Sequence, residues 1–270
     1  MKRAQLCTVY VGLFIACFAG LVAATPACAV DRKEVVKQAR QSYCNLRDLG
    51  LAEFQATIKP NWEVVLGDQV KTDPKSAEAA LKLLNGLHFS MKLDSADKVT
   101  VDHSADAPPP NEKAAAGFEQ IYSGMSQAMD GFFETWSAFM LHSPFPAVED
   151  EYKLEEVGAE YRLSWKEKDT NVVANLSRNL IMTELLVTSK DFTSTLKPQF
   201  AATPGGLVLS GYEADYVPAS GPGKVHLKVK LDYQDVSGLQ LLRTLFMDST
   251  YDGTPNQIEL AFSNYQLKKR

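Results

Sequence analysis

The residue types that most often perform chemistry in proteins are sparse in this chain. Its four histidines lie far apart, at His88, His103, His142 and His226. None of them stands at metal-ligand spacing from another histidine or from a cysteine. His226 falls on the polar side of an alternating segment, where we expect water to solvate it. The histidines therefore indicate structural or surface roles, and the sequence predicts no metal site and no cofactor.

The carboxylates gather in one acidic run, made of Glu149, Asp150, Glu151, Glu155 and Glu156. Paired carboxylates can act as general acid and base, but a run of this kind is more typical of a solvated edge. The chain has no G-x-S-x-G, no H-E-x-x-H, and no S-x-x-K with its usual companions. A non-catalytic protein is therefore the prediction, and an enzyme is the least favoured class.

The N-terminus has the three parts of a secretory signal peptide. Lys2 and Arg3 precede an apolar run from Val9 to Ala24, and Ala27-Cys28-Ala29 offers small residues for cleavage. We predict a signal peptide over residues 1–29 and a mature protein in the periplasm or outside the cell. Two alternatives stay open: an uncleaved N-terminal anchor, and a lipoprotein that keeps a lipidated Cys28.

Residues 30–270 are long enough for one domain with a sizeable core, and no linker divides them. Cys44 is their only cysteine, so no internal disulfide can form. Cleavage after Ala29 removes Lys2 and Arg3 but no acidic residue, which changes the formal net charge from −5 to −7. A modestly acidic protein with dispersed lysines is a poor partner for nucleic acid or anionic membranes. We expect no stable membrane span after cleavage.

The C-terminal half consists of alternating segments at spacings of about ten residues, which are typical of strands. Lys224–Tyr233 is the clearest of them. Its apolar side chains share one face, and they are Val225, Leu227, Val229, Leu231 and Tyr233. Short turns between such segments favour antiparallel neighbours, and a large twisted sheet of this type curls. Its apolar face must be buried against something.

Three segments have helical periodicity. Asp31–Leu49 is amphipathic and stops at Gly50, and a second helix begins at Asp73-Pro74. The third and longest lies near 112–142 and has an apolar stripe rich in aromatic residues and methionine. Because the helices precede a long series of strands, the fold class is predicted as α+β, with a large curved antiparallel sheet.

We hypothesise that the long helix and the sheet enclose an apolar cavity. Methionine adapts to flexible ligands because its side chain is unbranched. The predicted lining from the strands is Phe54, Phe89, Met91, Trp165, Leu227 and Val229. The predicted lining from the helix is Met129, Phe132, Phe133, Trp136 and Met140. For each of these residues ordinary core packing is the competing interpretation, because protein interiors contain few voids.

The order of two segments resembles a known family. A helix with Tyr43-Cys44-Asn45-Leu46 passes directly into the strand Leu51–Ile58, and Ser237-Gly238-Leu239-Gln240-Leu241 precedes the final strand, Ile258–Leu267. This arrangement is similar to the LolA-like superfamily of bacterial envelope proteins. The resemblance implies an unclosed β-barrel with helices covering its concave apolar face. The segment near 112–142 is longer and more hydrophobic than the family's lid, so we treat it as an insertion.

Members of that superfamily carry the acyl chains of lipoproteins, bind other lipids or act as periplasmic sensors. The resemblance therefore implies an exported protein that binds or carries a hydrophobic ligand, such as a lipid or the acyl chains of a lipoprotein. The alternative is an interaction or sensor module of the same fold, with a filled core and a protein partner in the envelope. The matching motifs are architectural, so they transfer no individual functional residue.

Overall fold

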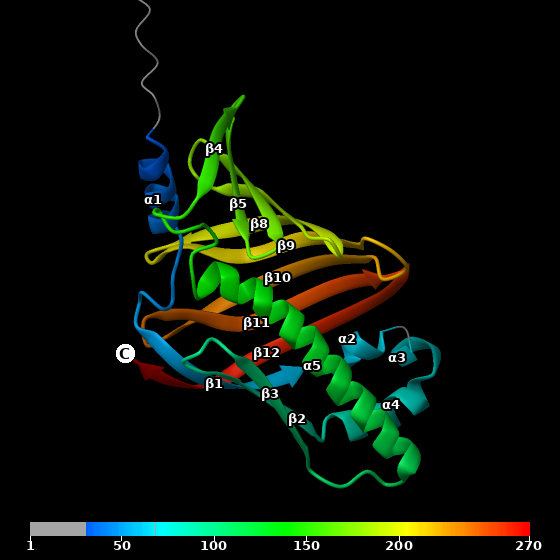
Figure 1. The fold of residues 1–270 in the computed structure, drawn as a ribbon. Helices are drawn as coiled ribbons and strands as arrows, with labels where there is room; N and C mark the ends of the chain where they lie inside the picture. The colour runs from blue at the N-terminus through cyan, green and yellow to red at the C-terminus, as the bar shows by residue number, and fades with distance from the viewer. Residues whose placement is uncertain (1–30, 68) are drawn as a thin grey trace, which may run out of the picture. The chain divides into compact units, whose positions relative to one another are not determined.

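A computed structural model of the chain describes residues 31–67 and 69–270; the predicted signal peptide, with Cys28, lies outside them. Within Arg32–Arg270, which form one unit, twelve strands build a single sheet (Figure 1). Their order is β3-β2-β1-β12-β11-β10-β9-β8-β7-β6-β5-β4. Every neighbouring pair is antiparallel. Among the described residues β3 and β4 are the two edges, so the sheet is not closed.

The elements have the following bounds. The strands are β1 Leu51–Pro60, β2 Leu87–Leu93, β3 Val99–Ala105, β4 Tyr152–Val157, β5 Glu160–Glu167, β6 Thr170–Ser177, β7 Met182–Thr188, β8 Phe192–Thr203, β9 Gly206–Pro218, β10 Val225–Val236, β11 Leu239–Tyr251 and β12 Thr254–Lys269. The helices are α1 Arg32–Ser42, α2 Trp62–Leu66, α3 Gln69–Thr72, α4 Pro74–Leu84 and α5 Glu112–Met140. The prediction of an α+β protein with a large antiparallel, unclosed sheet is confirmed.

From β4 to β12 each strand pairs with the next along the chain, and tight turns make this possible. Ser237 and Gly238 join β10 to β11, with φ angles of 56° and 84°. Asp252 and Gly253 join β11 to β12, with φ angles of 45° and 87°. Two-residue turns with positive φ at both positions match the twist of antiparallel strands. The last strand then pairs with the first, with Phe262 opposite Ile58.

Helix α1 ends at Ser42, so the prediction of a helix as far as Leu49 is wrong. Tyr43 forms a parallel bridge with Leu207, and the Cys44 N–H donates to the Leu207 carbonyl over 2.9 Å. A Cβ at Gly206 would lie only 2.9 Å from the Cys44 backbone nitrogen. Glycine at 206 is therefore what lets the chain leave the helix and run against β9. Periodicity within the helix could not reveal this long-range contact.

Helices α2 to α4 connect β1 to β2, and α4 begins where the sequence predicts a helix. The Asp73 carboxylate accepts a hydrogen bond from the Ser76 N–H over 3.2 Å, and Pro74 occupies the first turn of α4. Trp62 of α2 is buried, with its ring 6.2 Å from the ring of Phe89 on β2.

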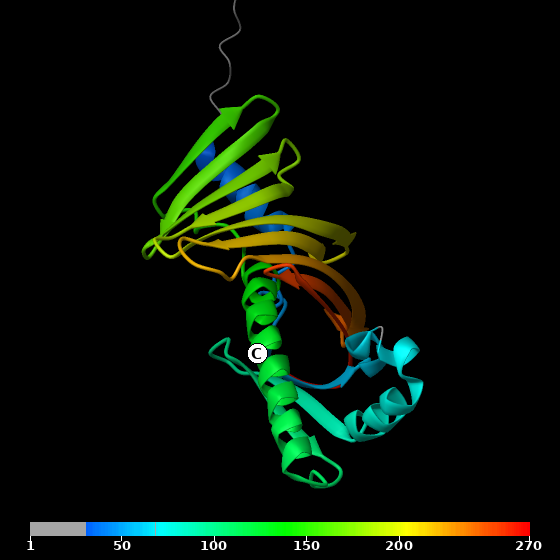
Figure 2. The same ribbon diagram turned by 90° about the vertical axis from the view of Figure 1, so that its right-hand side faces the viewer.

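Helix α5 lies across one face of the sheet and packs on β3 and β9 (Figures 1 and 2). Its first turn is capped by Asn111, whose side chain accepts from the Ala114 N–H. Its buried side chains are Tyr122, Met125, Met129, Phe132, Phe133, Trp136, Phe139 and Met140. They recur at spacings of three and four residues, as the sequence predicts for one face of a helix.

A buried arginine holds together the loop after α1, the β2–β3 turn and the end of α5. The Arg47 guanidinium donates to the Leu51 and Asp94 carbonyls and to the Asp97 carboxylate. His142, just after α5, lies 3.1 Å from the other oxygen of Asp97. Burial alone raises the pKa of Asp97, but the hydrogen bond and charge of Arg47, assisted by His142, hold this pKa below its ordinary value.

This network predicts a pH-dependent contribution to stability. Because the pKa of Asp97 is lowered by folding, its contribution is present above the unfolded-state pKa of about 4 and is lost as the pH falls through the folded-state value. We expect Asp97→Asn to lower the free energy of unfolding by about 2 kcal/mol at pH 7, the size of a charge-assisted hydrogen bond. Asparagine keeps the side-chain shape and tolerates the positive φ at this position.

Urea unfolding of wild type and Asp97→Asn at pH 7 and at pH 3 measures the difference in their free energies of unfolding. The difference between them should be smaller at pH 3 than at pH 7, because the contribution of Asp97 declines below its unfolded-state pKa. A difference that is equal at the two pH values would contradict this role for Asp97.

Candidate functional site

The face of the sheet that contacts α5 can be followed strand by strand, because direct partners in an antiparallel ladder point to the same face. The hydroxyl of Tyr212 on β9 forms a hydrogen bond with the side chain of Thr135 on α5. Tyr212 is opposite Val229 on β10, which is opposite Met247 on β11. All three are buried. This inner row therefore lies on the α5 face.

Two residues further along β9, Ala214 belongs to a second row on the same face. This middle row crosses eight strands, and its members are Leu154, Leu163, Ala174, Leu185, Leu196, Ala214, Leu227 and Ser249. Leu163 and Ala174 are fully buried, whereas Leu185 and Leu227 are half-buried. The covering of the face is thus complete at some strands and partial at others.

A third, outer row lies nearer the hairpin ends. Its members are Tyr152, Trp165, Val172, Val187, Ser194, Tyr216, Val225 and Tyr251. Val172 is buried, most of the others are half-buried, and Tyr251 is 57% exposed. The ring of Phe192 stacks on that of Tyr216 with centroids 5.2 Å apart. In Figure 2 the strands β4–β8 extend beyond the C-terminal end of α5.

We call five half-buried residues of these two rows the open apolar face: Trp165, Val187, Tyr216, Val225 and Leu227. Apolar side chains that share one face of a sheet and reach solvent are a feature of binding sites. It is the surface of this molecule that we assign as the candidate functional site.

The residues predicted to line a cavity divide into two groups. Nine are at most 3% exposed and lie in the packed core: Phe54, Phe89, Met91, Met129, Phe132, Phe133, Trp136, Met140 and Val229. The rings of Phe133 and Trp136 are 5.8 Å apart, and that of Phe54 is 6.4 Å from Trp136. Trp165 and Leu227 are half-buried and belong to the open apolar face. The structure thus separates residues that the sequence analysis grouped together.

Three residues of the open apolar face are not among the predicted site residues: Val187, Tyr216 and Val225. All three fall in strands, but alternation alone does not say which part of a face another element covers. Trp136 illustrates the covered part. Its indole N–H donates to the Tyr233 hydroxyl over 3.3 Å, and that hydroxyl donates to the Leu209 carbonyl over 2.6 Å. Burial raises the pKa of Tyr233, which keeps this donor protonated.

Beside Trp165 the surface is hollowed where β4 begins. This depression has a volume of about 720 Å³ and lies between the loop before β4 and the end of β5. A smaller depression of about 290 Å³ adjoins it and shares Pro146, Asp150 and Trp165. Because Tyr152 and Trp165 line the larger depression and also belong to the outer row, the hollow continues the open apolar face.

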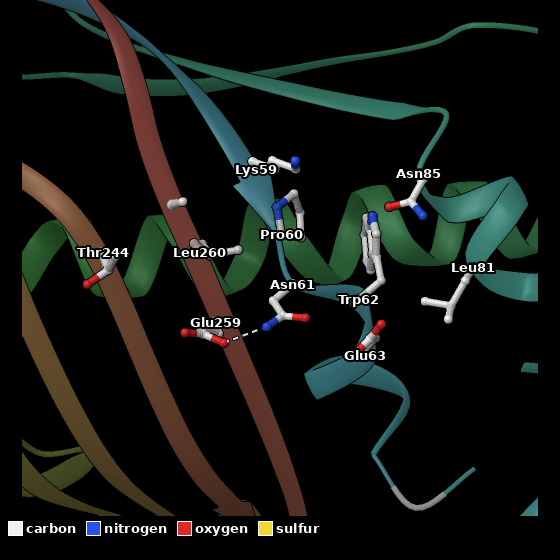
Figure 3. A pocket seen from close by; sticks show the side chains of 11 residues that line it. Lys59, Pro60, Asn61, Trp62, Glu63, Leu81, Asn85, Thr244, Glu259 and Leu260 are labelled. Atoms are coloured by element: carbon white, nitrogen blue, oxygen red, sulfur yellow. Dashed lines mark hydrogen bonds between the residues drawn. The ribbon is translucent and has the colours of Figure 1, made fainter. Parts of the chain in front are cut away.

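Another depression, of about 310 Å³, lies next to α2 (Figure 3). Lys59 and Thr244 line it, and both are opposite Ala261 on β12. The next residue, Phe262, points to the α5 face, where its ring is near that of Phe133, so Ala261 points to the opposite face. The depression therefore lies on the opposite face, and Figure 3 shows α5 behind the strands. Asn61 donates to Glu259 across it over 2.7 Å. None of the eleven predicted site residues lines it.

The histidines, which most often perform chemistry, pair with neighbouring side chains. His88 lies 2.6 Å from Asp106, His226 lies 2.9 Å from Asp215, and the ring of His103 stacks on Tyr122. Within residues 31–67 and 69–270 no three His, Cys, Asp or Glu side chains are grouped to hold a metal ion.

Two carboxylates of the acidic run form ion pairs, and the lone thiol is buried. Glu155 pairs with Lys153 and Glu156 with Arg178 at the β4 edge. Cys44 is buried, and burial raises the pKa of its thiol to about 11, which leaves it protonated and unreactive at neutral pH.

No family model, curated protein or solved structure matches this chain. In the part of the chain that the structure describes, none of the helices has both the length and the apolar character needed to cross a membrane.

Two leucines on β10 test whether the face of the sheet that contacts α5 is divided into covered and open parts. Leu227 and Leu231 point to the same face, but Leu231 is 8% exposed and lies opposite the fully buried Leu245. We expect Leu231→Ala to lower the free energy of unfolding by about 3 kcal/mol, as in a packed core, and Leu227→Ala by about 1 kcal/mol. Urea denaturation measures both; equal losses would show that Leu227 is also a core residue.

Proposed function

We propose that this protein binds a long acyl chain on the open apolar face, as an exported, non-catalytic lipid-binding protein of LolA-like architecture. The observation that carries the proposal is the pair of aligned, largely apolar rows from β5 to β10, in which the five residues of the open apolar face stay half-buried on the face that α5 contacts. In this proposal the sheet is curved, α5 covers the concave side over β9–β12 and β1–β3, and the ligand lies on the remainder of that side.

The dimensions and energetics of the rows support an acyl chain. Six adjacent strands at about 4.8 Å spacing give a path of about 24 Å. One acyl chain spans about half of the 30 Å hydrocarbon core of a bilayer, so this path holds a whole chain. Each methylene removed from water contributes about 0.8 kcal/mol, so contact along such a path gives useful affinity without any specific polar contact.

The proposal places the ligand beside the packed core and not within it. The nine buried lining residues hold α5 on the sheet, and Trp136 and Phe133 remain predicted ligand contacts only if α5 moves away. The predicted signal peptide, export and location in the periplasm or outside the cell are parts of the same proposal and rest on the sequence pattern of residues 1–29.

The alternative function is an envelope interaction or sensor module whose partner is a protein. The tight packing between α5 and the sheet favours it, because a filled core needs no ligand. The two functions differ in what accompanies the purified protein. Extraction with organic solvent followed by mass spectrometry should find stoichiometric lipid if the protein is a carrier and none if it is an interaction module.

A matched pair of variants on β7 locates the ligand. Val187 belongs to the open apolar face, whereas its neighbour Leu186 points to the opposite face and is also half-buried. A carboxylate in contact with an acyl chain must be desolvated, which is costly. We therefore expect Val187→Glu to weaken binding of a fluorescent fatty-acid probe at least tenfold, and Leu186→Glu to change it less than threefold.

Probe titration with both variants and wild type gives the result, and thermal unfolding confirms that each variant is folded. Equal affinities for the two variants would place the ligand elsewhere on the molecule.

A further inference from the structure

The open apolar face ends at a hollow that differs from it in chemistry. We call this hollow the Trp165 notch; it is the depression of about 720 Å³ beside β4 and β5. Trp165 and Tyr152 form its aromatic side, and the loop residues Pro146 and Asp150 close it on another side. A ligand on the outer row that reaches Trp165 has entered the notch, because Trp165 belongs to both.

The strand ends give the notch its shape. The first residue of β4, Tyr152, is opposite Trp165, so β5 continues past the start of β4 through Lys166 and Glu167. At this corner the edge of β5 faces the loop that leads into β4. Backbone groups at an exposed strand edge are available to a polar ligand.

The charges around the notch are balanced. Three lysines and three carboxylates line it: Lys153, Lys166, Lys168, Asp150, Glu151 and Glu167. Lys153 pairs with Glu155 over 2.8 Å, and Asp150 accepts from the Ala147 N–H over 2.8 Å. Lys166 and Lys168 are exposed at the end of β5. Both signs of charge are therefore present within one hollow that also has an indole ring.

We infer that the Trp165 notch takes the zwitterionic headgroup of an amphiphile, a phosphate ester that also contains an ammonium group. The inference rests on the proposed function, since the acyl part of the same molecule lies on the open apolar face. Lysine ammonium groups bind phosphate oxygens. Aromatic rings attract ammonium groups through their π-electrons, and carboxylates pair with them. A headgroup with negative charge alone would pair with the lysines and offer no positive group to the three carboxylates.

Three lipids with the same acyl chains test the headgroup directly. Phosphatidylethanolamine, phosphatidylglycerol and diacylglycerol compete, at equal concentration in one detergent, with the bound fluorescent fatty-acid probe. We expect the zwitterionic lipid to displace the probe at a concentration at least tenfold lower than either of the others.

A double lysine variant tests whether the Trp165 notch is the cause of this headgroup preference. In Lys166→Gln/Lys168→Gln the preference for phosphatidylethanolamine over diacylglycerol should fall to less than threefold, while diacylglycerol displaces the probe as in wild type. The control Lys75→Gln/Lys82→Gln makes the same change of charge on α4 and should keep the full preference.

The outcomes separate this inference from the proposed function. Displacement that is independent of the headgroup, or a preference that survives in the Lys166→Gln/Lys168→Gln variant, overturns the headgroup site and leaves acyl binding in place. A stronger preference for phosphatidylglycerol overturns the zwitterionic assignment. If neither the probe nor any of the three lipids binds, both the headgroup site and the acyl-binding function are wrong.

Discussion

Trp136, near the C-terminal end of α5, is buried in the contact between this helix and the sheet, and the rest of the structure depends on that contact. Its ring packs against Phe54 and Phe133, and its N–H begins a short chain of hydrogen bonds through Tyr233 to the backbone of β9. An indole can be buried at low cost only when its N–H has a partner. The position of Tyr233 therefore fixes where the C-terminal half of α5 sits on the sheet.

This placement divides one face of a twelve-stranded sheet into two parts with different properties. Where α5 packs, the apolar side chains of the strands and helix fill the space between them. On the strands beyond the end of α5 the alternating pattern continues, and some of its apolar side chains, such as Leu163 and Ala174, are buried, whereas others, such as Trp165 and Val187, are only half-buried. An apolar surface in contact with water is unfavourable. We therefore interpret it as the proposed binding surface for a hydrophobic chain.

Much of this fold could be predicted from the sequence because it is encoded locally. The alternation of Lys224–Tyr233 gave a strand, the stripe of 112–142 gave a helix, and Asp73-Pro74 gave a helix start, all as the structure has them. The end of α1 could not be predicted, because Tyr43 and Leu207 are far apart in the chain. The site could be predicted only in part for the same reason. Trp165, Leu227 and Phe89 have equally apolar patterns, but Phe89 is core because Tyr122 of α5 and Trp62 of α2 pack against it, whereas the other two reach solvent.

The most direct test of the account is to locate a bound chain. A crystal of the protein grown with a fatty acid brominated along its chain shows the bromine positions by anomalous scattering. The account predicts bromine peaks beside Leu227, Tyr216 and Val187, with α5 still packed on the sheet. Peaks between α5 and the sheet, beside Trp136 and Phe133, or no bound fatty acid at all, would contradict it.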